Sequence, residues 1–106
     1  IKTSISFIDF NFRRPLALAD AAEKVHLAPS YFSKIFHEKT GMTFKNYVIN
    51  KRLDFAMRVI KATNMPIAEV CTECGFKSEP HFIRAFKNKF SNSPRYFRKI
   101  EKKTVN

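Results

Sequence analysis

The only two cysteines in the chain, Cys71 and Cys74, lie three residues apart and are by type its most reactive side chains. A Cys-x-x-Cys pair is typical of a redox couple or of half a zinc site. A structural zinc ion needs four ligands, and the sequence has no second cysteine pair. Side chains three residues apart on a helix lie on the same side, and a free cysteine is often buried as a small hydrophobe. We therefore interpret both as core residues and keep a zinc- or redox-sensing module as the alternative.

The other residues offer little for catalysis. The three histidines, His26, His37 and His81, have no partner carboxylates at a suggestive spacing. We find no nucleophile–base arrangement, no paired-acid motif and no glycine-rich phosphate loop, since the chain has only two glycines. The sequence therefore predicts a protein that is not an enzyme, with no catalytic residue, no bound metal and no cofactor.

Positive charge is the strongest compositional feature. The 106 residues include 20 Lys and Arg against 9 Asp and Glu, for a formal net charge of +11. Such a surplus in a small folded domain indicates a polyanionic partner, either nucleic acid or an anionic membrane. No apolar run approaches the roughly 18 residues that a spanning helix needs. Two cysteines form no disulfide framework, so we expect a cytoplasmic protein, and a chain that begins without Met is expected to be a fragment of a longer one.

Hydrophobic periodicity predicts an all-α chain of about seven helices with no convincing strand. The expected helices cover residues 1–12, 18–25, 29–40, 44–63, 67–74, 79–90 and 95–100. Gly41 is expected to stop the third helix, and Thr43 and Ser78 to cap the N-termini of the helices that follow them. The long helix has two apolar stripes, which predict contact with two separate cores. The stripes are Phe44, Val48, Phe55 and Val59, and Ile49, Leu53, Ala56 and Ile60.

The chain repeats itself after 49 to 50 residues. The segment LADAAEKVHL at 18–27 matches IAEVCTECGF at 67–76, and SYFSKIFHEKT at 30–40 matches PHFIRAFKNKF at 80–90 after one inserted residue. Each copy is a short helix, a turn and a longer helix, the helix-turn-helix pattern whose second helix can enter a DNA major groove. In this alignment Cys71 pairs with Ala22 and Cys74 with Val25 on the inward face, which supports the interpretation of both cysteines as core residues.

The repeat predicts two helix-turn-helix subdomains joined by a long linker helix, with subdomains at 1–42 and 64–106 and the linker at 43–63. A helix of about 20 residues spans roughly 30 Å. Successive major-groove segments on one face of DNA lie about 34 Å apart. One chain is therefore expected to place two recognition helices in adjacent major grooves.

A set of motif residues runs through the second half of the chain. They are Ile67, Ala68, Gly75, Phe76, Phe82, Phe86, Lys87, Ser93, Pro94, Phe97 and Arg98, together with RLDFA at 52–56. In these residues the chain resembles the C-terminal DNA-binding domain of the AraC/XylS transcription regulators, from about Phe7 to Lys99. The resemblance implies two helix-turn-helix subdomains that bind asymmetric sites in double-stranded DNA.

The same resemblance implies a bacterial transcription regulator, most often an activator, that works near RNA polymerase. It places the protein in the cytoplasm, associated with the nucleoid. It also implies a separate effector or dimerisation domain that is missing from this chain. Three residues depart from the family pattern. His26 stands where the first turn usually has Gly, so we expect His26 to adopt a strained or left-handed conformation. Ala17 and Ala28 stand where the family often has Ser caps, which cost about 1 kcal/mol each when lost, so the first subdomain is expected to be the less stable.

The first recognition helix should turn Phe32, Ile35 and Phe36 inward. Its outward face holds the base-contacting candidates Ser30, Tyr31, Ser33, Lys34 and His37. By match to the family, Ser30, Ser33 and Lys34 reach base edges or phosphates. Ser and Lys lack the two-pronged fork with which Arg reads a base, so base reading and simple phosphate gripping both stay open for this helix.

The second recognition helix turns outward the candidates Glu79, Pro80, His81, Ile83, Arg84 and Lys87. Arg84 is expected to read guanine, and Ile83 is expected to meet a thymine methyl group. Glu79 either accepts from cytosine or sits favourably near a helix N-terminus. The candidate phosphate contacts are Lys39, Lys77, Lys89, Arg95, Arg98 and Lys99. An RNA-binding or membrane-surface domain also fits the charge, but it does not explain the repeat.

Overall fold

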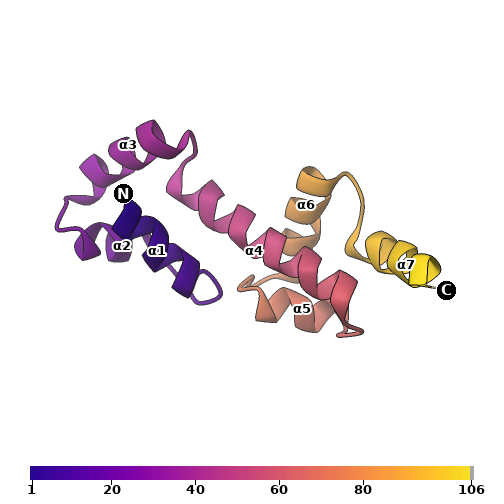
Figure 1. Cartoon of the computed structure of the whole chain (residues 1–106). Helices are drawn as coiled ribbons and strands as arrows, with labels where there is room; N and C mark the ends of the chain where they lie inside the picture. The colour runs from indigo at the N-terminus through magenta and orange to yellow at the C-terminus, as the bar shows by residue number, and fades with distance from the viewer. Residues whose placement is uncertain (106) are drawn as a thin grey trace. The chain divides into compact units, whose positions relative to one another are not determined.

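The computed structural model describes residues 1–105, and the side chains of residues 1–101. This part of the chain is all-helical, with seven helices and no strand (Figure 1). The helices are α1 (Lys2–Asn11), α2 (Leu18–Lys24), α3 (Pro29–Thr40), α4 (Phe44–Ala62), α5 (Ile67–Glu73), α6 (Glu79–Phe90) and α7 (Pro94–Val105). The predicted all-α class is confirmed. The last helix continues beyond its predicted end at residue 100, because the residues that follow contain no Gly or Pro to stop it.

The chain divides into two compact units, Ile1–Lys51 and Arg52–Asn106. The division falls inside α4, so the first half of this helix belongs to the first unit and the second half to the second. Each unit thus has four helical segments: α1, α2, α3 and the start of α4 in one, and the end of α4, α5, α6 and α7 in the other. The predicted boundaries at 42/43 and 63/64 stay a prediction.

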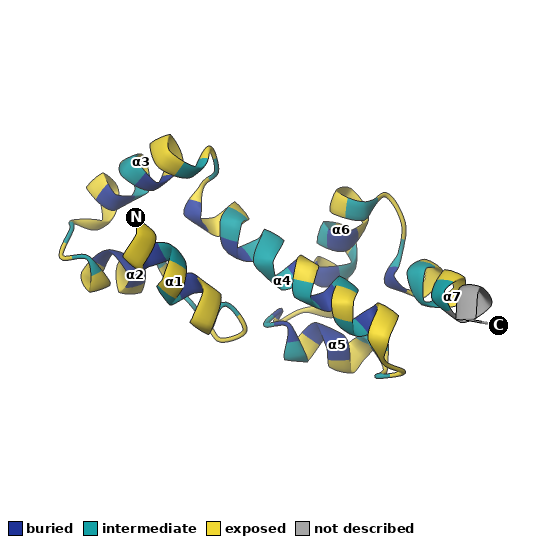
Figure 2. Cartoon of the chain, in the orientation of Figure 1, coloured by how far each residue is buried: buried dark blue, intermediate teal, exposed yellow. Residues whose placement is uncertain are grey.

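The core of the first unit joins all four of its segments (Figure 2). Aromatic contacts set α3 against the start of α4, since the ring of Phe36 meets Phe44 at 5.8 Å and Tyr47 at 5.3 Å, both edge-on. Edge-to-face packing at these distances is favourable beyond the area that it buries. The buried residues of this core are Ile8, Ala21, Ala22, Phe32, Phe36, Phe44 and Val48.

The second unit buries a comparable set of side chains. Phe86 on α6 contacts Phe90 at 4.7 Å and Phe97 of α7 at 5.9 Å, and Phe82 contacts Phe76 at 5.3 Å. These contacts fix α6 against α7 and against the turn that precedes α6. The buried hydrophobic residues here are Leu53, Ala56, Ile60, Val70, Cys71, Cys74, Phe76, Phe82 and Phe86.

The prediction that the two apolar stripes of the long helix meet two separate cores is confirmed, but each stripe is buried only where it lies beside its own core. Phe44 and Val48 are buried in the first unit, whereas Phe55 and Val59 of the same stripe lie in the second unit and are only half-buried. Leu53, Ala56 and Ile60 of the other stripe are buried in the second unit, so the helix divides between the cores both by face and along its length. A core contacts only the helical turns beside it. Phe55 and Val59 continue the stripe of Phe44 and Val48, but they lie beyond the first core and are therefore only half-buried.

Candidate nucleic-acid interface

The turns inside the two helix-turn-helix units have the same backbone geometry. In the first, the N–H of Leu27 donates to the carbonyl of Ala22 at 3.0 Å, and in the second the N–H of Phe76 donates to the carbonyl of Cys71 at 3.1 Å. This bond closes the end of a helix when the residue before the donor is left-handed. His26 has a φ of 57° and Gly75 a φ of 103°. The left-handed conformation expected for His26 is confirmed.

The ends of the two recognition helices also match. Gly41 after α3 has a φ of 76°, and Ser91 after α6 has a φ of 69°. The N–H of each donates back to the helix, at 2.9 Å to His37 and at 2.8 Å to Lys87. The predicted stop at Gly41 is confirmed. Ser91 occupies the same position without the glycine that this conformation favours.

The equivalence continues into the helices that follow. The hydroxyl of Thr43 accepts from the N–H of Asn46 at 3.1 Å, and the hydroxyl of Ser93 accepts from the N–H of Tyr96 at 3.1 Å. Both are N-caps, of α4 and of α7, and the cap predicted at Thr43 is confirmed. The structural repeat is therefore longer than the one found by aligning 18–40 with 67–90, and it includes the first turn of the next helix.

The N-termini of the two recognition helices differ. The hydroxyl of Ser78 accepts from the N–H of His81 at 3.4 Å, which confirms the cap predicted for α6. Ala28 at the matching position of α3 has no side-chain acceptor. Ala17 before α2 lacks one too, although the carboxylate of Asp20 accepts from the Ala17 N–H at 3.3 Å, which is half of a capping box. The lower stability expected for the first unit stays a prediction.

Helix α3 turns a polar face to solvent, as predicted. Phe32 and Phe36 are fully buried and Ile35 is half-buried, so the inward face is confirmed (Figure 2). Ser33, which is predicted to face outward, lies at the border of the two faces and is half-buried. The remaining candidates are exposed: Ser30, Tyr31, Lys34 and His37. The orientation therefore suits contact with a ligand, and the contacts themselves stay a prediction.

Helix α6 has the same arrangement. Phe82 and Phe86 are fully buried, and Ile83 is half-buried beside the exposed face. The ring of His81 packs edge-on against Phe76, with ring centres 5.2 Å apart. The exposed candidates on this helix are Glu79, Pro80, His81, Arg84 and Lys87.

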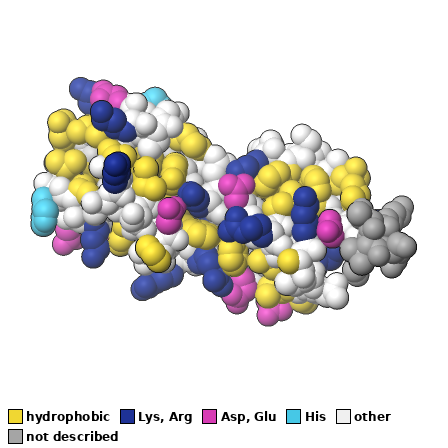
Figure 3. Space-filling model, viewed as in Figure 1, with side chains coloured by type: hydrophobic (Ala, Val, Ile, Leu, Met, Phe, Trp, Pro, Cys, Tyr) yellow, Lys and Arg dark blue, Asp and Glu magenta, His cyan; other side chains and the backbone are white. Residues whose placement is uncertain are grey.

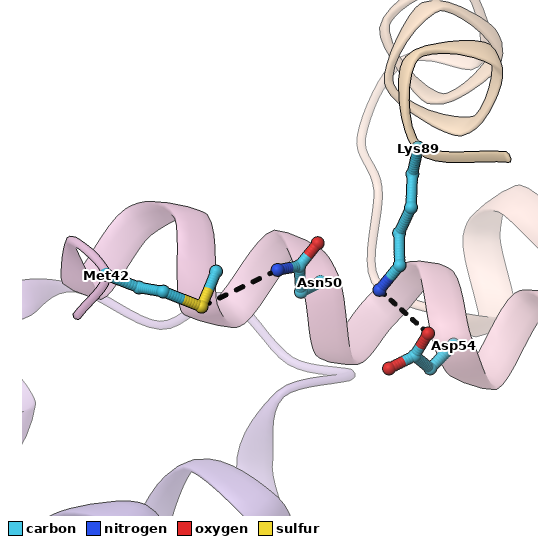
Figure 4. Close-up of polar contacts among 4 residues, drawn as sticks. All are labelled: Met42, Asn50, Asp54 and Lys89. Carbon is cyan, nitrogen blue, oxygen red and sulfur yellow. Dashed lines mark hydrogen bonds and ion pairs between the residues drawn. The ribbon is translucent and has the colours of Figure 1, made fainter. Parts of the chain in front are cut away.

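The candidate phosphate contacts fall into two groups. Five of them, Lys39, Lys77, Lys89, Arg95 and Lys99, are exposed, and Arg98 is half-buried. The ammonium of Lys89 pairs with Asp54 of α4 at 2.8 Å, as Figure 4 shows, where a separate contact at 3.7 Å joins Asn50 to the sulfur of Met42. Because this pair is partly exposed, it competes only weakly with a phosphate for the Lys89 ammonium.

Arg98 differs from its predicted role. Its side chain is turned into the second unit, where Nε donates to the carbonyl of Ile60 at 3.2 Å and Nη1 donates to the carbonyl of Met65. Its remaining nitrogen, Nη2, is also buried. A guanidinium engaged with two carbonyls is not presented to a phosphate, so this geometry gives Arg98 a structural role instead.

Sequence reasoning missed Lys45. The longer repeat pairs GMTFK at 41–45 with SNSPR at 91–95, so Lys45 is the counterpart of Arg95. Both side chains are exposed, each two residues after its capping hydroxyl. The signal was present in the sequence as the matched Thr43 and Ser93, which lie just beyond the aligned segments.

Positive charge is present in both units. Residues 1–51 hold eight Lys and Arg against four Asp and Glu, and residues 52–106 hold twelve against five. Figure 3 shows Lys and Arg side chains distributed over the visible face, with fewer acidic ones between them. Each unit therefore attracts a polyanion by itself. In the described part of the chain, no helix combines the length and the apolar character that a membrane crossing requires.

The two cysteines lie in the core of the second unit. Cys71 is 4% exposed and Cys74 is fully buried, and the Cys74 thiol donates to the carbonyl of Cys71 at 3.3 Å. Burial raises the pKa of Cys74 to about 12 and also raises the pKa of Cys71. Thiolates are the reactive and metal-binding form, so neither thiol is prepared for such chemistry. Among the described residues, no three His, Cys, Asp or Glu side chains are grouped to hold a metal ion.

Comparison with known proteins agrees with this geometry. A family model described as a helix-turn-helix domain matches residues 21–100. The uncharacterized HTH-type transcriptional regulator YfiF of Bacillus subtilis (strain 168) is 34% identical over 92 residues, which are 87% of this chain and 29% of YfiF. The chain thus spans less than a third of that relative.

Two solved structures have the same fold. A transcriptional regulator from Chromobacterium violaceum, described by its AraC-type DNA-binding domain, has a TM-score of 0.87 at 27% identity, covering 94% of this chain and 89% of its own. The DNA-binding domain of the global transcriptional factor AdpA, solved in complex with a target DNA, has a TM-score of 0.87 at 20% identity, covering 92% and 87%.

Proposed function

The chain belongs to the AraC-type helix-turn-helix family of transcription-regulator DNA-binding domains, which are not enzymes, and from this premise we propose that it binds specific sequences in double-stranded DNA through α3 and α6. The observation that carries the proposal is the match between the two units. Each has the same closed turn, the same left-handed end and the same capped following helix, and each exposes the polar face of its second helix.

The two recognition helices are proposed to occupy adjacent major grooves. Helix α4 has 19 residues, and at 1.5 Å per residue a helix of this size is about 28 Å long. That length is close to the roughly 34 Å between successive major-groove segments on one face of DNA. The AdpA domain, which has the same fold, was solved in complex with a target DNA, and this supports DNA as the ligand.

The wider role follows from the family. We propose that the protein is a bacterial activator that works beside RNA polymerase, in the cytoplasm at the nucleoid. Because the chain spans 29% of YfiF, we also propose that an effector or dimerisation domain completes the whole protein. These roles are inferred from the family alone, because the exposed faces of α3 and α6 bear only on DNA binding.

The test is a binding titration followed by fluorescence anisotropy. A duplex selected from a random pool is compared with a scrambled duplex of the same composition, at salt concentrations from 50 to about 200 mM. Each phosphate contact contributes about −0.9 to the slope of log K against log salt. Six contacts therefore predict a slope near −5, with the selected duplex bound more than about 1,000-fold more tightly than the scrambled one at physiological salt.

A charge control separates site contacts from net charge. Lys45→Ala should make the salt slope shallower by about 1 unit, whereas Lys61→Ala, at the exposed end of α4, should leave it unchanged. Equal affinity for selected and scrambled duplexes at physiological salt would contradict the specific function.

A further inference from the structure

We propose that base readout is concentrated in the second unit and that the first unit holds DNA mainly through phosphates, so that the recognised site contains one strongly specified segment. This inference rests on the proposed function and states how its two units divide the recognition. Three observations carry it. They are the chemistry of the exposed side chains at matched positions, the contacts that fix the start of each recognition helix, and the exposed residues with which the first unit can bind phosphates.

The exposed chemistry differs at matched positions. Lys34 on α3 and Arg84 on α6 occupy equivalent places, and both are exposed. The guanidinium fork of Arg84 can donate two parallel hydrogen bonds to guanine, whereas the ammonium of Lys34 is a point charge. The neighbouring matched residues, Ser33 and Ile83, also differ in selectivity. Ile83 offers an apolar contact that suits a thymine methyl group, whereas the Ser33 hydroxyl can hydrogen-bond to donors and acceptors of any base.

The N-terminus of α6 is ordered before any ligand arrives. Ser78 caps the helix through the His81 N–H at 3.4 Å. Gly75 holds its left-handed turn without a Cβ, and the ring of His81 is held against Phe76. Side chains that read bases must be placed to within about half an ångström. Because the start of α6 is already fixed in the free protein, its side chains need little further ordering when DNA binds.

The N-terminus of α3 lacks each of these supports. Ala28 has no capping side chain, and His26 carries a Cβ in the left-handed turn. The ring of Tyr31, the counterpart of His81, is 53% exposed and packs on no other described ring. The backbone of the turn is closed as in the second unit, but holding the Tyr31 side chain in place on DNA costs conformational entropy that the packed His81 ring has already lost, which weakens discrimination between bases.

The first unit is nevertheless well supplied for phosphates. Lys34, Lys39 and Lys45 are exposed on α3 and at the start of α4, with the hydroxyl groups of Ser30 and Tyr31 nearby in sequence. Lys, Ser and Tyr contacts to phosphate oxygens fix the register of a protein on the duplex but carry no sequence information. The first unit would therefore raise affinity equally for all sequences.

The experiment selects preferred duplexes from a random pool with the 106-residue chain and with two matched variants, Arg84→Ala and Lys34→Ala. Both positions are exposed, and circular dichroism checks that each variant keeps its helices. The wild-type pool should contain one enriched segment of a few base pairs. Arg84→Ala should reduce discrimination at one G·C pair of this segment by about 5- to 150-fold. Lys34→Ala should weaken binding to selected and scrambled duplexes by the same factor and leave their ratio unchanged.

Two results would overturn the inference while leaving the proposed function intact. One is a wild-type pool with two equally enriched segments about one helical turn apart. The other is a Lys34→Ala pool with an altered base preference beside an Arg84→Ala pool that keeps the wild-type one. A wild-type pool with no enriched segment would instead remove the proposed sequence specificity, and the division of readout with it.

Discussion

The guanidinium of Arg98 on α7 reaches the last turn of α4, where its Nε lies 3.2 Å from the carbonyl oxygen of Ile60, 38 residues earlier in the chain. Its Nη1 donates to the carbonyl of Met65 in the loop that follows. The carbonyls at the end of a helix have no partner within the helix. Arg98 therefore completes the end of α4 and ties it to α7.

Replacing Arg98 should destabilise the second unit. Arg98→Ala removes two hydrogen bonds from a charged donor and should lower the free energy of unfolding by about 2–3 kcal/mol, measured by urea denaturation. Arg98→Lys keeps the charge but loses the fork, so it should recover only part of that stability. The neighbouring Lys99→Ala, which is exposed, should leave stability unchanged. If Arg98→Ala keeps the wild-type stability but binds DNA more weakly, the structural role is contradicted and Arg98 acts as a phosphate contact, as the sequence predicted.

Local features could be predicted from the sequence because one or two residues determine them. The caps at Thr43 and Ser78 and the stop at Gly41 each follow from a single side chain or its absence. The outward faces of α3 and α6 follow from helical periodicity, which is why the polar candidates were found together.

Features that depend on packing between elements could not be predicted. Arg98 meets Ile60 only because α7 packs beside the end of α4, and Lys89 is paired only because α6 places it near Asp54. No periodicity encodes either contact. The left-handed Ser91 is similar, since serine alone gives no signal for that conformation and only its place in the repeat does.

Two positions in the turns should gain stability from glycine. His26 and Ser91 are left-handed, with φ values of 57° and 69°, a conformation that strains any residue with a Cβ. His26→Gly and Ser91→Gly should each raise the free energy of unfolding by about 1 kcal/mol. Gly41→Ala is the reverse test, because its added Cβ would meet no atom within 4 Å, so the loss should come from the backbone alone. Thermal unfolding of all three variants measures the effect, and a stabilising Gly41→Ala would contradict it.

A buried hydroxyl in the first unit should be dispensable. Ser4 is fully buried on α1, and its Oγ has no hydrogen-bond partner. Ser4→Ala should raise the free energy of unfolding by about 1–2 kcal/mol, since it removes an unsatisfied polar group. The exposed Ser6→Ala on the same helix should gain only about 0.5 kcal/mol from helix propensity. Equal gains from the two variants in chemical denaturation would show that Ser4 is satisfied after all.

The buried thiols should make stability fall in alkali. In the folded protein the pKa of Cys74 is raised to about 12, whereas an unfolded cysteine titrates near 8.5. Above that pH the unfolded chain releases a proton that the folded chain retains, so stability is full below about pH 8 and declines from there toward pH 12. A double variant, Cys71→Ala with Cys74→Val, carries the matched residues of the first unit. Between pH 8 and pH 10 its free energy of unfolding should fall by about 2 kcal/mol less than that of the wild type.

A thiol reagent provides the independent check. Both cysteines of the folded wild type should react slowly at pH 8 and rapidly in urea, because burial excludes the reagent and disfavours the thiolate. Equally fast reaction in the folded protein would mean that the pair is accessible. It would also revive the redox alternative for Cys71 and Cys74.

The most direct test of the account maps both recognition helices on DNA. In the cysteine-free double variant, a single new cysteine is placed at Ser30 on α3 or at its counterpart Pro80 on α6, both exposed, and is coupled to an iron chelate that cleaves nearby DNA. On a duplex selected by the wild-type chain, the two derivatives should cut two separate segments about 10 base pairs apart on one face. Cleavage confined to one segment for both derivatives, or diffuse cleavage from either, would contradict a protein that places two helices in adjacent major grooves.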